Sequence, residues 1–225
     1  MKKILFGLIT SSLLFMSCSK DDDPSNPAAD NYMSTTTGNS WNYAYVDNTD
    51  ATNNYNYTLT STNRDSTAAG RIYHVFTSSD GANEYYNITG NEYYTFQAFS
   101  LAGADTTITN LYLKTGAAVN TSWVQTYTLD AGVPVDINVT NKIAATGVTK
   151  VVGAKTYNDV IDVVTTIAIP ALAADPTATF TTNIHYYYAP KYGMIQNDAK
   201  IDLVSGLLGL NVHTDDKTTL TSANF

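Results

Sequence analysis

The side chains best suited to acid–base or metal chemistry are three histidines and two glutamates. His74, His185 and His213 occur singly, each in a different run of alternating residues. A joint site would require the fold to bring them together, so we expect a hydrogen-bonded structural role for each. The chain contains no nucleophile elbow, phosphate-binding loop, dinucleotide fingerprint, paired-histidine zinc motif or calcium loop.

The carboxyl groups give no stronger signal. Glu84 and Glu92 are the only glutamates, and they belong to one predicted hairpin in which Glu92 adjoins the turn and Glu84 lies several residues away. We therefore expect no facing pair of the kind a glycosidase needs. His213 with Asp215 and Asp216 has metal-binding side chains, but a polar turn explains these residues equally well. The sequence predicts no enzyme, no metal site and no cofactor.

The first residues are typical of a secretory signal. Lys2 and Lys3 precede an apolar stretch, Ile4 to Met16, that is too short to span a bilayer. The following Ser17-Cys18 completes a pattern that resembles the lipobox cleaved by lipoprotein signal peptidase. Cys18 is the only cysteine, so an intramolecular disulfide is excluded. We expect residues 1–17 to be a signal peptide and Cys18 to carry the lipid anchor.

The segment after Cys18 has two compatible interpretations. It is rich in Asp, Ser, Asn and Pro, which predicts a disordered acidic tether over residues 18–34. Its beginning also resembles the acidic export signal of surface-exposed Bacteroidota lipoproteins, which implies the outer face of the outer membrane. The residues of this signal are Ser19, Lys20, Asp21, Asp22 and Asp23.

Two short patterns later in the chain resemble the O-glycosylation sequon that Bacteroidota use on exported proteins. They are Asp65-Ser66-Thr67 and Asp105-Thr106-Thr107, with Ser66 and Thr106 as the candidate acceptors. Both are predicted to lie in loops, where a glycan would be accommodated.

Charge argues against nucleic acid as a partner. The formal net charge is −8, and loss of Lys2 and Lys3 with the signal makes it about −10. Only Arg64 and Arg71 supply guanidinium groups, and no basic stripe occurs. Phosphate-binding surfaces need clustered Lys and Arg.

Residues 35–225 are predicted to form a single all-β domain. Thr, Tyr, Asn, Val and Ile dominate, and period-two alternation recurs, as in Trp41, Tyr43 and Tyr45. Roughly a dozen strands fit the length. Such a curved antiparallel sheet must form a barrel, a half-barrel or a two-layer sandwich. Trp41 and Trp123 are expected to fill its interior.

One hairpin can be assigned in register. Gly90-Asn91 suits a two-residue turn in which Gly supplies a positive φ. Ile88 then faces Tyr93, Tyr86 faces Thr95, and Tyr85 faces Phe96. Because neighbours on a strand point to opposite faces, one of each adjacent tyrosine pair must point away from the core.

Two motifs resemble a group of uncharacterised Bacteroidota surface lipoproteins. The first, Gly38 to Tyr43, fits G-x-x-W-x-Y, and the second, Tyr188 to Ile195, fits Y-A-P-x-x-G followed by two hydrophobic residues. The resemblance implies a curved antiparallel sheet and carries no activity. Pro190 should end a strand, and Gly193 should permit the turn into the next.

Two functions are consistent with these features. The first is a non-catalytic cell-surface lipoprotein that is held at the membrane by its lipid and uses outward tyrosines to bind a glycan or a partner protein. The alternative is a carrier or sensor of a hydrophobic ligand inside a barrel-like cavity. The apolar runs Val160 to Ile169 and Ile201 to Leu210 could line that cavity or fill it.

Overall fold

The computed structural model describes residues 31–101, 104–130, 134–206 and 209–225. They form twelve β-strands and two short 3-10 helices, η1 (Ala51–Asn53) and η2 (Pro170–Ala174). The first six strands are β1 (Ser40–Asp47), β2 (Tyr55–Ala68), β3 (Arg71–Ser78), β4 (Asn83–Thr89), β5 (Glu92–Leu101) and β6 (Ala104–Lys114). The other six are β7 (Ser122–Asp130), β8 (Pro134–Val152), β9 (Lys155–Ala168), β10 (Thr179–Ala189), β11 (Gly193–Ser205) and β12 (Leu210–Asn224).

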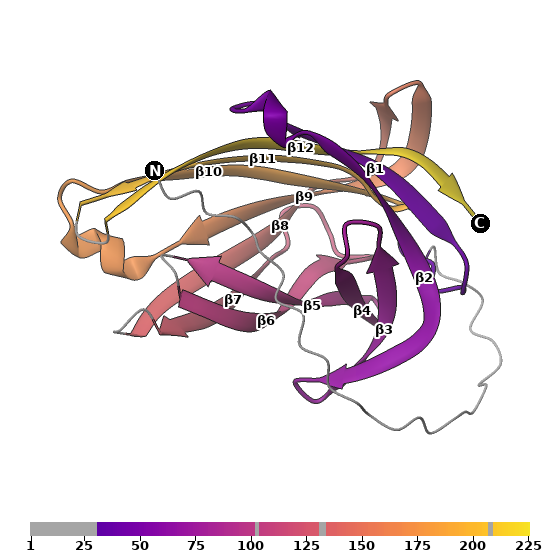
Figure 1. The fold of residues 1–225 in the computed structure, drawn as a ribbon, viewed down its shortest axis with the longest axis horizontal. Coiled ribbons are helices and arrows are strands. Elements are labelled where there is room, and N and C mark those ends of the chain that lie inside the picture. Colours follow the sequence, from indigo (N-terminus) through magenta and orange to yellow (C-terminus); the bar gives the residue numbers. More distant parts are fainter. Residues whose placement is uncertain (1–30, 102–103, 131–133, 207–208) are drawn as a thin grey trace.

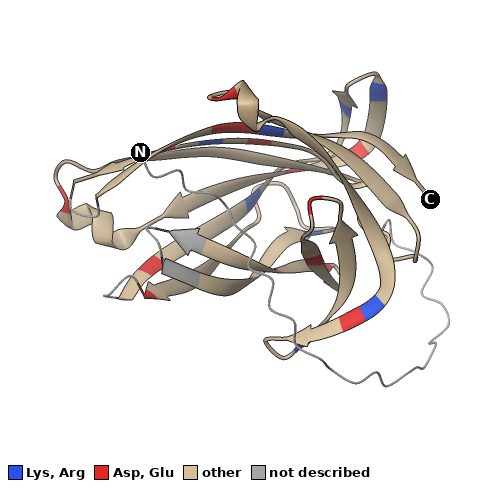
Figure 2. Ribbon diagram, in the orientation of Figure 1, with Lys and Arg blue, Asp and Glu red and all other residues tan. Residues whose placement is uncertain are grey.

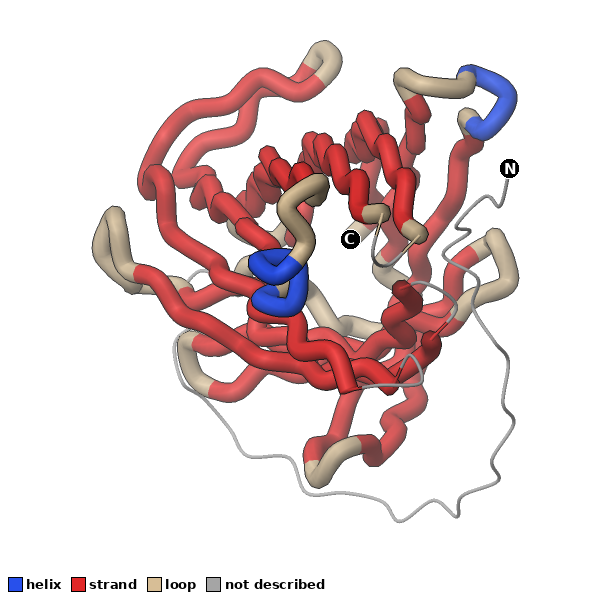
Figure 3. The backbone as a smooth tube through the Cα atoms, turned by 90° about the vertical axis from the view of Figure 1, so that its left-hand side faces the viewer, coloured by secondary structure: helices blue, strands red, loops and turns tan. Residues whose placement is uncertain are grey.

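All twelve strands belong to one antiparallel sheet that curls into a nearly closed barrel (Figures 1 and 3). The order is β6-β5-β4-β3-β2-β1-β12-β11-β10-β9-β8-β7, so every chain neighbour except β6 and β7 is a sheet neighbour. The first strand pairs with the last, from Ser40 opposite Asn224 to Asp47 opposite Asp216. The predicted all-β sheet of about a dozen strands is confirmed, in its barrel form.

The assigned hairpin is also confirmed in detail. Ile88 pairs with Tyr93, Tyr86 with Thr95, and Tyr85 with Phe96. Gly90 has a φ of +58°, the left-handed region that the two-residue turn requires.

The alternating connections give the barrel two distinct ends. The turns that follow odd-numbered strands, with η1 and η2, lie at one end, here called the η end. The turns that follow even-numbered strands lie at the other, the terminal end, together with the start of β1 and the end of β12. Strand β10 ends at Ala189 before Pro190, and Gly193, with a φ of +68°, opens β11, as predicted.

The core of the barrel includes two residues that precede the predicted domain boundary at residue 35. Tyr32 and Met33, which the sequence assigned to the tether, are 8% and 3% exposed and belong to the core. The Lys191 amide donates to the Asn31 carbonyl at 2.7 Å, which ties this segment to the turn between β10 and β11. Burial of these two large apolar side chains offsets the conformational entropy that is lost when the segment is fixed in place.

Charged side chains are dispersed over many strands, with both signs interspersed (Figure 2). Within the described parts of the chain, no helix has the length and apolarity needed to cross a membrane.

Candidate functional site

The barrel interior holds a cavity of about 350 Å³. It lies between two packed clusters of buried side chains, because it is bordered by members of both. The larger cluster, at the terminal end, includes Trp41 and Tyr188, and the smaller one includes Leu129 and Leu172. Trp41 is fully buried and Trp123 nearly so, so both fill the interior as predicted.

The cavity wall combines aliphatic and aromatic side chains from strands all around the barrel. The tyrosines that line it are Tyr43, Tyr57, Tyr86, Tyr112, Tyr127, Tyr186 and Tyr188. The branched aliphatic residues are Leu59, Ile108, Val139, Ile167, Ile184 and Ile201. The two apolar runs singled out in the sequence therefore both line the cavity and fill the interior beside it. Ile167 and Ile201 line the cavity, while Val163 and Leu203 pack in the clusters.

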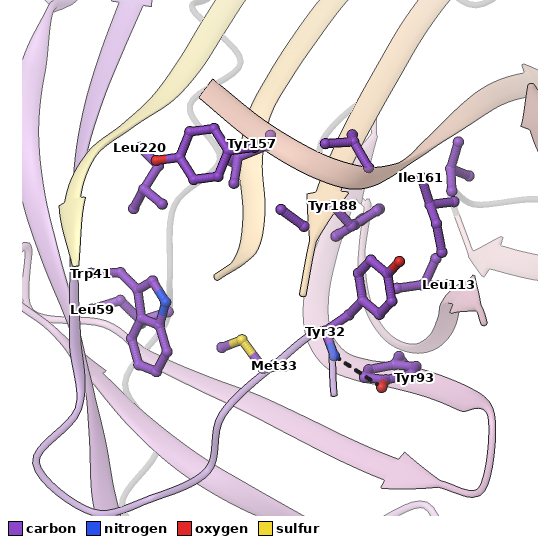
Figure 4. Close-up of a cluster of buried hydrophobic side chains, with 14 of the residues drawn as sticks. Tyr32, Met33, Trp41, Leu59, Tyr93, Leu113, Tyr157, Ile161, Tyr188 and Leu220 are labelled. Atoms are coloured by element: carbon purple, nitrogen blue, oxygen red, sulfur yellow. Dashed lines mark hydrogen bonds between the residues drawn. The ribbon is translucent and has the colours of Figure 1, made fainter. Parts of the chain in front are cut away.

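The N-terminal segment places Tyr32 and Met33 among buried side chains of the larger cluster (Figure 4). Met33 lines the cavity, next to Tyr32. The Tyr32 amide donates to the Tyr93 hydroxyl at 3.1 Å, and the Tyr32 hydroxyl donates to the Asp159 carbonyl at 2.6 Å. A Cβ on Gly193 would lie 2.9 Å from Met33 Sδ. The segment is thus fitted tightly against β5, β9 and β11.

Two carboxyl groups face the cavity near the η end. Glu84 lies just after the β3–β4 turn and accepts a hydrogen bond from the Tyr86 hydroxyl. Asp216 lies opposite the last residue of β1 and accepts one from the Tyr45 hydroxyl. Burial raises the pKa of both carboxyl groups above their ordinary values, and the tyrosine hydrogen bonds offset part of this.

Two further polar atoms in the wall lack a hydrogen-bond partner among the described residues. Thr95 Oγ1 and Asn110 Oδ1 are buried without a hydrogen bond to any described residue. They come from residues that face each other on β5 and β6, and both residues line the cavity. Buried polar atoms are seldom left unpaired in proteins. A polar group of a bound molecule, or water, would satisfy both.

Side chains rather than a backbone ladder close the barrel between β6 and β7. Over the described residues no ladder joins these strands. Trp123 Nε1 donates to the Leu111 carbonyl at 2.7 Å, and Gln125 bonds both the Leu111 amide (2.8 Å) and the Thr109 carbonyl (3.0 Å). The Tyr127 hydroxyl donates to the same Thr109 carbonyl at 2.9 Å. We call this junction the β6–β7 seam.

The three histidines do not form a joint site. They lie on β3, β10 and β12, and each is hydrogen-bonded through Nδ1 to an aspartate of an adjacent strand, as expected for structural histidines. The pairs are His74–Asp65 at 3.0 Å, His185–Asp162 at 3.0 Å and His213–Asp202 at 2.9 Å.

One of these pairs extends into a chain with the residue types of a serine hydrolase triad, which the sequence reasoning missed. His74 Nε2 lies 2.9 Å from Ser61 Oγ, opposite Asp65. However, Ser61 is 1% exposed, its hydroxyl also bonds the Thr35 carbonyl at 3.0 Å, and it does not line the central cavity. These hydrogen bonds therefore fasten the N-terminal segment to β2 and β3.

The other candidate groups are also separated. His213 and Asp216 are on strand β12, not in a turn, and alternation directs them to opposite faces. Among the described residues no three His, Cys, Asp or Glu side chains are grouped so as to hold a metal ion. Glu92 lies opposite Thr89 beside the hairpin turn and pairs with Lys114 at 3.0 Å, whereas Glu84 faces the cavity. The two glutamates do not form a facing pair.

The expectation of exposed outward tyrosines is wrong. All seventeen tyrosines are described, and only Tyr55, at 46%, is exposed. Outward tyrosines do occur, but other side chains cover them. Arg71 lies 3.8 Å from the ring centre of Tyr94, and Lys150 lies 3.3 Å from that of Tyr187.

The candidate glycosylation residues are not in loops. Ser66 lies within β2, opposite Tyr73, and Thr106 lies within β6, opposite Phe99. Their Asp-Ser-Thr and Asp-Thr-Thr patterns predict loops, but hydroxylated and β-branched residues also suit the partly exposed end of a long strand. Cys18 and the segment Ser19, Lys20, Asp21, Asp22 and Asp23 lie outside the described residues, as do residues 1–17.

Comparison with known proteins gives a structural likeness to a solved protein. No protein-family model matches the chain, and no curated protein matches it. A crystal structure of a protein from Parabacteroides distasonis ATCC 8503, described as a "putative lipoprotein", is similar with a TM-score of 0.48 and 12% sequence identity. The likeness covers 86% of this chain and 98% of that one.

Proposed function

We propose that this protein is a non-catalytic, lipid-anchored lipoprotein of the outer membrane that holds a small, largely apolar ligand inside its barrel. The observation that carries the proposal is the cavity. Its volume of about 350 Å³ falls in the range of small-molecule sites, roughly 300–1,000 Å³. The two clusters are packed on either side of it, so the cavity is space that the protein's own core leaves unfilled.

The ligand-carrier interpretation is favoured over a tyrosine contact surface because of where the tyrosines lie. Seven of them line the cavity, while outward ones such as Tyr94 and Tyr187 are covered by a basic side chain. A non-catalytic role is supported by the separation of Glu84 from Glu92 and by the inaccessible hydroxyl of Ser61.

Anchoring and orientation are proposed from the sequence. Cys18 would carry the lipid, and the segment from Ser19 to Asp23 would direct the protein to the outer face of the outer membrane. Protease treatment of intact cells, followed by detection of the mature chain, tests this orientation. Digestion supports the cell exterior, and survival until the outer membrane is breached contradicts it.

Native mass spectrometry of the mature protein, extracted mildly from its host, tests the ligand directly. We expect a bound small molecule that is lost when the cavity is filled. Ala199→Trp places an indole in the cavity from β11, and Val204→Trp places one on the outer face of the same strand, where Val204 is 37% exposed. Retention of the molecule by Ala199→Trp, or its equal loss from both variants, would contradict the proposal.

A further inference from the structure

The charged residues that line the cavity are all acidic. Among the residues that line the cavity there are two carboxylates, Glu84 and Asp216, and no lysine, arginine or histidine. Both lie near the η end. A ligand with a negative charge would meet like charges there, whereas a positive charge would be attracted.

Neither carboxylate has a positively charged partner among the described residues. Some outward-facing carboxylates do have one, as in Lys200–Asp215 at 3.4 Å. By contrast, Glu84 and Asp216 accept from the tyrosine hydroxyls of Tyr86 and Tyr45. Burial raises the pKa of both carboxyl groups, and a neighbouring cation would relieve that penalty.

The aromatic surroundings suit a cation as well. Tyr45 and Tyr55 have ring centres 4.9 Å apart, Tyr55 and Tyr57 5.8 Å, and Tyr57 and Tyr43 5.2 Å, which makes a row from the exposed Tyr55 into the cavity. Asp216 accepts a hydrogen bond from Tyr45, a member of this row, and Glu84 lines the same cavity as Tyr43 and Tyr57. Tyrosine faces attract cations, and a carboxylate beside them strengthens the attraction.

The outer face of the same sheet provides an internal comparison. There the protein supplies its own cations to tyrosine rings, as with Arg71 over Tyr94 and Lys150 over Tyr187. On the inner face, tyrosines and carboxylates are present and no cation lines the wall. Asn110 Oδ1, buried and unpaired, is in addition an acceptor that an N–H group would satisfy.

We propose that the cavity binds a cationic amphiphile, a molecule with an apolar body and a protonated amine that the negative charges of Glu84 and Asp216 attract to the η end, beside the tyrosine row. This inference rests on the proposed ligand-binding function and specifies the ligand class. The apolar body would occupy the interior among Leu59, Ile184 and Ile201.

Isothermal titration calorimetry at neutral pH with octylamine, octanol and octanoate tests the inference, because these probes share one chain and differ in charge. We expect octylamine to bind about tenfold or more tightly than octanol, since hydrogen bonds to charged groups are the stronger ones, and octanoate to bind most weakly. Glu84→Gln and Asp216→Asn should each reduce the ratio of octylamine to octanol affinity severalfold. Asp136→Asn, on the outer face of β8, removes one charge and should leave the ratio unchanged.

The outcomes separate the two proposals. If octanol or octanoate binds as tightly as octylamine, the cationic preference is overturned while the cavity remains a ligand site. If Asp136→Asn lowers the ratio as much as Glu84→Gln and Asp216→Asn, net charge rather than the site is responsible, and the inference fails. If none of the three probes binds, the ligand-binding function fails, and the inference with it. Near-ultraviolet circular dichroism of each variant checks that its fold is intact, and either inward variant alone suffices for the test.

Discussion

The β6–β7 seam makes a quantitative prediction, because one side chain there replaces part of a missing backbone ladder. Gln125 accepts from the Leu111 amide at 2.8 Å and donates to the Thr109 carbonyl at 3.0 Å. Gln125→Ala removes both hydrogen bonds. At about 1 kcal/mol net for each, the free energy of unfolding should fall by about 2 kcal/mol. For a domain of this size, that lowers Tm by roughly 4–8 °C.

Urea unfolding and amide hydrogen exchange measure the two consequences of Gln125→Ala. If the Leu111 amide exchanges through opening of the β6–β7 seam, it should exchange roughly thirtyfold faster in Gln125→Ala than in the unchanged protein. This factor corresponds to about 2 kcal/mol less free energy needed to open the seam. Amides in the β1–β12 ladder should change only through global unfolding. Thr126→Ala is the matched control, because its exposed hydroxyl points outward and bonds only Asn138 among the described residues. Equal Leu111 exchange in the two variants would refute the idea that Gln125 closes the barrel.

Three further predictions concern the core and the turns. Gly193→Ala should destabilise the protein by about 1 kcal/mol or more, measured by urea unfolding, because φ is +68° and the new Cβ would lie 2.9 Å from Met33 Sδ. Trp123→Phe should cost more stability than Trp41→Phe by about 1 kcal/mol, since only Trp123 Nε1 has a described hydrogen-bond acceptor; equal losses would contradict this. Hydrogen bonds to its carboxylate lower the pKa of Asp47 to about 2, so its stabilisation is present above the unfolded value near 4 and is lost as pH falls through 2. Unfolding measured from pH 5 to pH 2 should therefore show a shallower decline for Asp47→Asn.

The local features of the fold could be predicted from the sequence because they depend on neighbours along the chain. The alternation of residue types and the turn at Gly90 fix the pairing of Tyr85 with Phe96. Both signals can be recognised from a few consecutive residues. The interior positions of Trp41 and Trp123 follow from the same alternation. The error over Ser66 and Thr106 shows the limit of this reasoning, since polar residues at a long strand's end look like a turn.

The cavity could not be predicted, because it depends on contacts between strands far apart in the chain. Alternation predicts which residues share a face with Tyr86 on its own strand, and likewise for Tyr186. Only the closure of the barrel brings these two faces together as one interior. Asp216 was grouped with His213 by proximity in sequence, whereas the strand places them on opposite faces. Met33 was assigned to the tether because nothing in the local pattern reveals its pocket beside Gly193.

The pairing of β1 with β12 also has a consequence for the order in which the chain can fold. Hairpins such as β4–β5 can form as soon as both strands are available, but the ladder from Ser40 opposite Asn224 to Asp47 opposite Asp216 must wait for strand β12. Until then β1 and β11 each present an unpaired edge, which favours association between unfinished chains. Folding is therefore completed only after Asn224 has been synthesised, and a chain cut before Leu210 would keep both edges open.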